Sequence, residues 1–278
     1  MIKNFILVLM LIIIPIVPKS SMADDRIIVS VTILPQAYFV ERIGGDRVDI
    51  RVMVPPGASP ETFDPTPLQL LNLSRSELYF KIGSPNLEVE IRFQRFLQDH
   101  GKHISVVDMS TGVKTLKEDP HIWLSPAVVK AAASNIYRAL SSADPANTPY
   151  YRENLRSFLT DIDALDRRIK QKLMKKNGYV FMVYHSAWGY FAREYGIRQL
   201  AIEEEGRPLN ISRIRAMISL ARKKGIKTIF IQKGFDEKGA SAIAREIGAK
   251  VVKVNPLERD WLKNLDDFSA ILKVALKP

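Results

Sequence analysis

The sequence predicts an α/β protein in which two parallel-sheet lobes are joined by one long, rigid helix. Short runs rich in β-branched residues alternate with helical segments before residue 126 and again after residue 177. This alternation is typical of parallel sheets wrapped by helices. Between the two regions, a charged segment carries a single apolar stripe spaced by threes and fours, which indicates an amphipathic helix. We therefore expect lobes at residues 24–147 and 177–278, bridged by a backbone helix at 148–176.

Each lobe shows β-strand runs bounded by turn residues. In the first lobe the expected strands are 26–34, 48–54, 78–82 and 104–107, and the expected helices are 35–44, one ending at Leu73, 86–99 and 126–142. In the second lobe the expected strands are 179–184, 198–202, 228–232 and 250–254, and the expected helices are 187–195, 211–224, 237–247 and 261–276. Glycines end several of these helices, which supports the boundaries.

The bridging helix has clear start and stop signals. Thr148 and Pro149 favour a helix beginning, and Asn177 followed by Gly178 favours its end. At 1.5 Å per residue such a helix is roughly 40 Å long, which is enough to run along two lobes. The alternative is an ordinary surface helix of a single domain.

The first 23 residues are typical of a secretory signal peptide. Lys3 precedes an almost unbroken apolar run at 5–17, and Ser21 and Ala23 are small residues at a cleavage position. We expect cleavage after Ala23 and export to a bacterial periplasm. The apolar run is short for a membrane span. The sequence contains no cysteine, so we expect neither a lipid-modified cysteine nor disulfides, and stability that rests on core packing.

The formal net charge of the chain is +11, and +9 remains without the two signal-peptide lysines. Export argues against a nucleic-acid partner, and the basic residues are not interleaved with aromatic ones as a nucleic-acid surface would require. We interpret the positive charge as solvated helix faces, and an anionic membrane surface nearby would also favour it.

A histidine in a stiff loop is the first candidate for a functional group. His121 lies between Pro120 and a run of Ile, Trp and Leu, and Pro126 follows. Because prolines fix φ and exclude an interior helix, this loop is rigid and holds an imidazole against an apolar wall. A histidine merely packed in a loop is the alternative, so other residues have to decide between the two.

The ends of the predicted strands supply those other residues. Ligands of open parallel sheets lie beyond the carboxyl ends of the strands. Side chains expected at such ends or in the loops that follow them are His185, Glu203, Glu204, Glu205, Gln232 and Asn255 in the second lobe and Glu61 and Asp64 in the first. Two histidines, carboxylates and side-chain amides facing one cleft are suited to a divalent metal ion.

Several long motifs in a fixed order resemble one protein family. They are VPPGASPETFDPTP, DPHIWLSP, HSAWGYFAREYGI, IEEEGRP, IFIQKGF, AREIGAKVV and NPLERDW. Over nearly all of the mature chain the sequence is similar to the metal-binding receptors of zinc/manganese-type ABC importers, the cluster A-I solute-binding proteins. The resemblance implies two lobes with one stiff backbone helix and limited closure, and a metal ion bound between the lobes. It also implies a receptor that delivers the ion to a membrane permease with a cytoplasmic ATPase. We expect a monomer without enzymatic activity.

The resemblance also implies a ligand set, with two departures from the family pattern. His121 and His185 match family ligands, whereas Glu61 stands where the family commonly has histidine and Asn255 where it has aspartate. Gln232 or water are alternatives for the fourth position. Such a mixed nitrogen and oxygen set accepts zinc first, and manganese or iron second, with a non-metal polar ligand as a third possibility. Both histidines must be neutral to bind metal, so we expect weaker binding below roughly pH 6.

Two rival functions remain from the sequence. An exported metallohydrolase would use the same two histidines and carboxylate to hold a catalytic zinc, but no HExxH or GxSxG motif is present. An adhesin would keep the fold without transport. Other residues receive structural interpretations: an incidental exposed pair for His100 and His103, cleft wall or core for Trp123, Trp188 and Tyr190, a solvated turn or outer acceptors for 203–205, and helix capping for Asp64 and Thr66.

Overall fold

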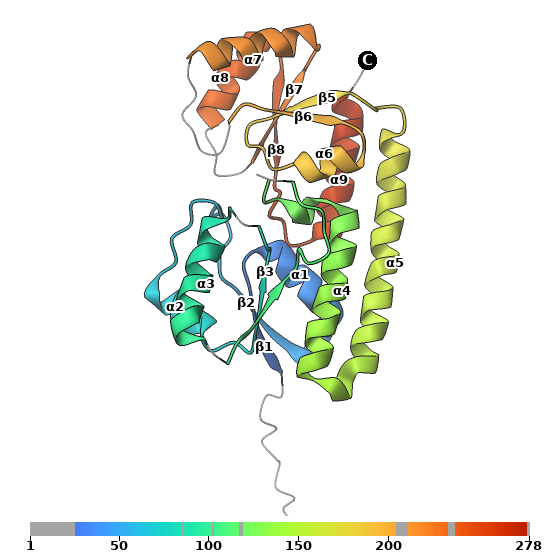
Figure 1. Ribbon diagram of the computed structural model, residues 1–278. Helices are drawn as coiled ribbons and strands as arrows, with labels where there is room; N and C mark the ends of the chain where they lie inside the picture. The colour runs from blue at the N-terminus through green and yellow to red at the C-terminus, as the bar shows by residue number, and fades with distance from the viewer. Residues whose placement is uncertain are drawn as a thin grey trace, which may run out of the picture.

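The computed structural model describes residues 26–84, 86–101, 103–116, 119–203, 211–232 and 237–276. The chain forms two α/β lobes, with one long helix running beside both of them (Figure 1). The expected signal peptide and its cleavage site lie outside the described residues and stay predictions. Within the described ranges, no helix combines the length and the apolar character that a membrane crossing requires.

The first lobe is built on a four-stranded parallel sheet in the order β2-β1-β3-β4. Its strands are β1 (Ile27–Val31), β2 (Val48–Val52), β3 (Leu78–Lys81) and β4 (Ser105–Asp108). The register pairs Ile27 with Val48 and Val29 with Leu78. The second lobe repeats the plan in the order β6-β5-β7-β8. Its strands are β5 (Val180–Val183), β6 (Arg198–Ala201), β7 (Thr228–Gln232) and β8 (Lys250–Val254).

Helices cover both sheets, and their bounds lie within a few residues of the predicted ones. They are α1 (Leu34–Gly44), α2 (Pro67–Leu73), α3 (Glu88–His100), α4 (Pro126–Ala143), α5 (Thr148–Leu173), α6 (Gly189–Glu194), α7 (Ile211–Lys223), α8 (Glu237–Ile247) and α9 (Trp261–Ala275). Short 3₁₀ turns are η1 (Gly45–Arg47), η2 (Ile122–Leu124) and η3 (Pro145–Asn147). The predicted architecture of two parallel lobes with a long bridging helix is confirmed.

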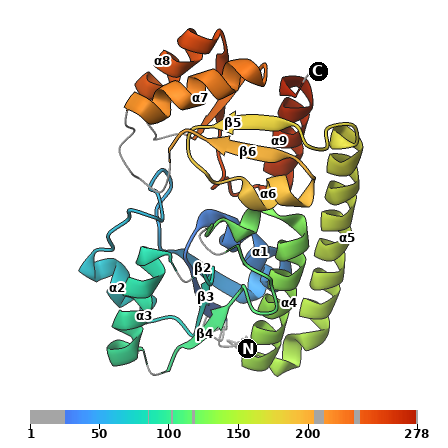
Figure 2. The same ribbon diagram turned by 45° about the horizontal axis from the view of Figure 1, so that its top comes forward.

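The apolar stripe of α5 is the reason this helix lies along both lobes. Phe158, Ile162, Leu165 and Ile169 are completely buried. The helix packs on α1 and α4 of the first lobe and on α9, which follows the strands of the second (Figure 2). Burying a row of large apolar side chains against partners from both lobes stabilises the rod by the hydrophobic effect and keeps it from being a free linker.

One side of the contact between the lobes is tightly packed. Trp261, at the start of α9, is fully buried and meets the ring of Phe39 edge to face at 5.3 Å. Its Nε1 donates to the carbonyl of Trp123 at 2.6 Å, and Trp123 Nε1 donates to the carbonyl of Pro256 at 2.8 Å. A residue from the end of the chain thus lies in the first lobe's core, and the residue boundaries proposed for the lobes remain a prediction.

A buried carboxylate organises the carboxyl edge of the first sheet. The side chain of Glu90 on α3 accepts hydrogen bonds from Thr32 Oγ1 and the Ile82 amide, each at 2.5 Å, and from the Gly83 amide at 3.0 Å. It therefore ties the segment after β1 to the segment after β3. Burial raises the pKa of Glu90 to about 7, although these hydrogen bonds and Lys81 oppose the shift.

Candidate metal centre

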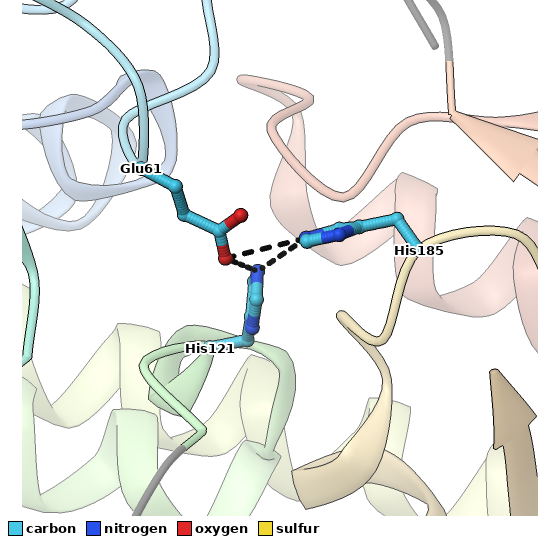
Figure 3. Close-up of side chains that lie close together, drawn as sticks. All are labelled: Glu61, His121 and His185. Atoms are coloured by element: carbon cyan, nitrogen blue, oxygen red, sulfur yellow. Dashed lines mark hydrogen bonds and ion pairs between the residues drawn. The ribbon is translucent and has the colours of Figure 1, made fainter. Parts of the chain in front are cut away.

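Three predicted ligands converge from three different segments of the chain. The Nε2 atoms of His121 and His185 lie 3.3 Å apart, and they are 3.4 and 3.3 Å from Glu61 Oε1, respectively. Figure 3 shows the three side chains pointing at one another across the contact between the lobes. Glu61 and His121 come from the first lobe and His185 from the second, so the site depends on both lobes being in place.

The spacing of these donor atoms fits a tetrahedral metal ion. Bonds of about 2.0–2.1 Å at tetrahedral angles place any two donor atoms about 3.3–3.4 Å apart. Neighbouring donors of an octahedral ion with bonds of about 2.1 Å would lie about 3.0 Å apart. The three observed separations, 3.3, 3.3 and 3.4 Å, match the tetrahedral value. The site can therefore hold one such ion on three corners and leave a fourth for another donor.

Glu61 is presented by the loop that follows β2. Residues 53–66 contain several prolines and make two backbone turns, from Ala58 to Pro55 at 3.2 Å and from Thr62 to Ser59 at 3.2 Å. Only 26% of the Glu61 side chain is exposed. Rigid proline-bounded turns lower the entropy cost of holding this carboxylate in place. The loop thus delivers one negative oxygen to the two imidazoles.

His121 is oriented by a carboxylate that the sequence interpretation missed. Asp119 Oδ1 lies 2.8 Å from His121 Nδ1 and also accepts the His121 backbone amide at 2.9 Å. An ionised carboxylate can only accept, so Nδ1 carries the hydrogen and the Nε2 lone pair faces the other ligands. The sequence could have indicated this role of Asp119. An aspartate two positions before a histidine can accept hydrogen bonds from both the backbone amide and the Nδ1 atom of that histidine.

The second lobe packs directly against that carboxylate. Gly189 begins α6, and a Cβ atom added there would lie 2.2 Å from Asp119 Oδ2. Any larger residue would have to displace the group that orients His121. A glycine at this position therefore allows the two lobes to meet at the metal centre.

A first prediction concerns Asp119. We expect Asp119→Asn to weaken zinc binding by about 10- to 100-fold, because the amide no longer fixes the Nδ1–H tautomer of His121. Isothermal titration of zinc into the metal-free protein measures the change, and Asp46→Asn, at an exposed aspartate outside the site, is the matched control. An affinity equal to that of the control would exclude the orienting role.

His185 follows the carboxyl end of β5 and is buried, with 4% of its side chain exposed. Its Nδ1 lies 3.8 Å from Oε2 of Glu203, which follows β6. Of the three glutamates considered as outer acceptors, Glu203 therefore faces the site, whereas Glu204 and Glu205 lie outside the described residues. The carboxyl ends of β5 and β6 are neighbours in the sheet, which explains why these two side chains meet.

The charges of the site change the proton affinities of its members. Burial by itself would lower the pKa of His185, but the carboxylates of Glu203 and Glu61 outweigh it and raise that pKa to about 9. Burial opposes ionisation of Glu61, yet its hydrogen bond to His185 and the electrostatic effect of the neighbouring imidazoles hold its pKa below the usual value. Without metal, a proton on His185 therefore balances the carboxylates, and a metal ion has to displace it.

Asn255 and Gln232 lie together at the contact between the lobes. Both line a cavity of about 260 Å³ between residues 54–58 of the first lobe and 255–258 of the second. The Asn255 amide donates to Glu258 Oε2 at 3.1 Å, and its oxygen accepts the Leu257 backbone amide at 3.1 Å. That oxygen already serves a local turn, so its coordination of a metal stays a prediction.

The remaining candidates have structural roles. His100 is exposed and stacks on Phe96 with ring centroids 4.6 Å apart. Thr66 caps α2 in a reciprocal pair with Gln69, as predicted. Asp64 instead pairs with Arg92. The other side chains considered are either in the core or exposed: Trp123, Trp188 and Tyr190 are buried and His103 is exposed.

Two lobes of one strand order, a long helix beside them and a buried His/His/Glu group between them define a metal-binding receptor of the ABC-importer type. The family model described as zinc-uptake complex component A, periplasmic (ZnuA), matches residues 29–277, and the chain belongs to this family. The resemblance inferred from the motifs is thereby confirmed.

Individual relatives agree with this assignment. The chain is 26% identical over 258 residues to the high-affinity zinc uptake system protein ZnuA of Bacillus subtilis, covering 84% of this chain and 79% of that protein. It is also 26% identical over 248 residues to the manganese ABC transporter substrate-binding lipoprotein PsaA of Streptococcus mitis, covering 82% and 79%. A crystal structure of ZnuA superposes with a TM-score of 0.87 at 35% identity, covering 91% of this chain and all of that one.

Proposed function

We propose that this protein captures one divalent metal ion outside the cytoplasm, zinc in preference to manganese or iron, and delivers it to the permease of an ABC importer with its ATPase. The observation that carries the choice of metal is the tetrahedral spacing of Glu61, His121 and His185. Two imidazoles and a carboxylate suit zinc, and the intrinsic order of affinities also places zinc above manganese and iron. Water, Asn255 or Gln232 completes the fourth position.

The zinc and the manganese protein described above do not decide this question, since they are equally similar to the chain at 26% identity. Because the donor atoms come from three separate segments of the two lobes, metal binding depends on the relative position of the lobes. The distances from His185 Nε2 to His121 Nε2 and to Glu61 Oε1 are both 3.3 Å. A small movement of one lobe against the other would change these distances and thereby allow the ion to be released to a permease.

The test is a competition between metals. Metal-free protein is titrated with zinc, manganese(II) and iron(II) under anaerobic conditions, and each affinity is measured by calorimetry or by competition with a chelating dye. We expect one site per chain and an affinity for zinc at least about 100-fold above that for manganese, in keeping with the intrinsic order. Tighter binding of manganese than of zinc would contradict the proposed specificity while leaving the receptor class intact.

An exported metallohydrolase is not favoured as a second function. The family model that matches the chain is described as a component of a zinc-uptake complex. In the described part of the chain, each carboxylate near the histidines is already engaged in binding or orienting them. Glu61 lies at the donor atoms, Asp119 holds His121, and Glu203 lies beside His185.

A further inference from the structure

The positive charge of this protein is concentrated in one part of the second lobe. Residues 211–254 contain eleven lysines and arginines and three acidic residues, a net charge of +8. The rest of the expected mature chain has 28 basic and 27 acidic residues, a net charge of +1. Nearly all of the excess therefore comes from α7, α8, β7, β8 and the segments between them.

The helices α7 and α8 lie at the end of the molecule that faces away from the first lobe, as both ribbon views show (Figures 1 and 2). Six basic side chains of residues 211–254 are exposed and, among the described residues, make no ion pair; we call this set the basic pole. They are Arg215, Lys223, Lys224, Lys227, Arg245 and Lys250. Acidic partners neutralise two others, Arg222 through Glu246 at 2.6 Å and Lys253 through Glu237 at 2.7 Å.

Two hollows open among these charges. A groove of about 670 Å³ between α7 and α8 has an apolar lining of Ile214, Ile218 and Ile243. The unpaired Arg215 and the ion pair of Arg222 with Glu246 are also on its wall. A second hollow of about 270 Å³ includes Lys224 and Lys227 and reaches the end of α9. Apolar surface next to unpaired cations is the combination that interfacial binding uses.

We propose that the basic pole binds the surface of an anionic phospholipid bilayer. The cations are spread over two helices, a turn and a strand start, which fits a continuous layer of phosphate groups better than one shaped protein partner. The metal centre lies at the carboxyl ends of the strands, whereas Lys227 and Lys250 flank the amino ends of β7 and β8. Contact through the pole therefore leaves the metal centre free and needs no bound metal.

The experiment uses the full mature chain and sedimentation with vesicles of phosphatidylglycerol and phosphatidylcholine, compared with phosphatidylcholine alone. The test variant is Lys223→Gln/Lys224→Gln/Lys227→Gln. The control, Arg75→Gln/Arg95→Gln/Lys114→Gln, removes the same charge from exposed positions of the first lobe. Because each basic residue near an anionic surface changes the partition coefficient about fivefold, the test variant should lose on the order of 100-fold.

We expect the wild type and the control variant to bind the vesicles that contain phosphatidylglycerol but not those of phosphatidylcholine alone. High salt should release both proteins from the vesicles. Equal binding by the two variants, or no binding by the wild type, would overturn the proposal. In the second case an acidic protein surface would be the remaining partner for these charges. Metal affinity, measured in parallel, should be unchanged in both variants, so failure here is distinct from failure of the proposed metal function.

Discussion

Replacement of His185 by alanine is expected to abolish high-affinity zinc binding. The substitution removes one of three donors, and it is the one that the second lobe contributes to the site. The loss should exceed the roughly 100-fold that a change in an orienting residue produces. Calorimetry measures it, with His100→Ala as the control because that histidine is exposed and stacked on Phe96.

Zinc binding by the wild-type protein should release a proton from His185. With the pKa of His185 raised to about 9 by Glu203 and Glu61 against burial, the metal-free site is protonated at neutral pH. Zinc must displace that proton, so affinity should rise about tenfold per pH unit up to pH 9. From the sequence alone we expected metal affinity to decline only below roughly pH 6, because an unperturbed histidine pKa was used. An affinity that is flat between pH 7 and 9, or a His185→Ala variant that still binds tightly, would contradict the site.

A second large effect is expected on the free energy of unfolding, which should depend on pH through the ionisation of Glu90. Burial raises its pKa from 4.5 in the unfolded chain to about 7 in the folded protein, against opposing hydrogen bonds. Below pH 4.5 the carboxyl is protonated in both states, and between pH 4.5 and 7 the unfolded chain ionises first. This group therefore lowers the free energy of unfolding by about 3 kcal/mol across that window and has a constant effect above it.

Glu90→Gln removes this pH dependence and also loses a hydrogen bond, since the new amide group faces backbone donors such as the Gly83 amide. Its unfolding free energy should be lower than that of the wild type near pH 4.5 by about 1–3 kcal/mol. That deficit should shrink as pH rises to 7. Urea unfolding of metal-free protein at several pH values measures both effects, and Glu88→Gln, exposed on the same helix, is the control. A wild-type-minus-variant difference that does not depend on pH would exclude the buried titration.

Local sequence patterns were enough to predict most of the fold. The bounds of β7, β8 and α8 match the expected ones, because apolar runs there end at glycines or polar residues that close each element. The apolar stripe of α5 predicted both its length and its buried face. Thr66 was recognised as a cap because the capping pair is local in sequence.

Interactions between distant segments could not be predicted in the same way. Trp261 lies in the first lobe's core beside Phe39, 222 positions earlier, and no local pattern indicates that contact. Glu90 lies in a charged helical segment, so in the sequence it resembles a surface residue. In the fold, the Thr32 hydroxyl and the Ile82 amide, which follow β1 and β3, donate hydrogen bonds to it. Gly189 is needed because Asp119 arrives from the other lobe.

The ligand set was predicted in part from the strand ends and in part from the family resemblance. Glu61, His121 and His185 converge as expected. Asn255 is engaged by Leu257 and Glu258, and its role depends on how the two lobes approach each other, which the sequence does not determine.

We propose that Glu61, His121 and His185 together hold one zinc ion. Zinc K-edge X-ray absorption of the protein loaded with one equivalent tests it most directly, because the spectrum reports the number and type of donors. We predict a four-coordinate zinc with two imidazole nitrogens and two oxygens at about 2.0–2.1 Å, reduced to one imidazole in His121→Ala. A six-coordinate spectrum, or two imidazoles that persist in that variant, would show that these three residues do not form the zinc site.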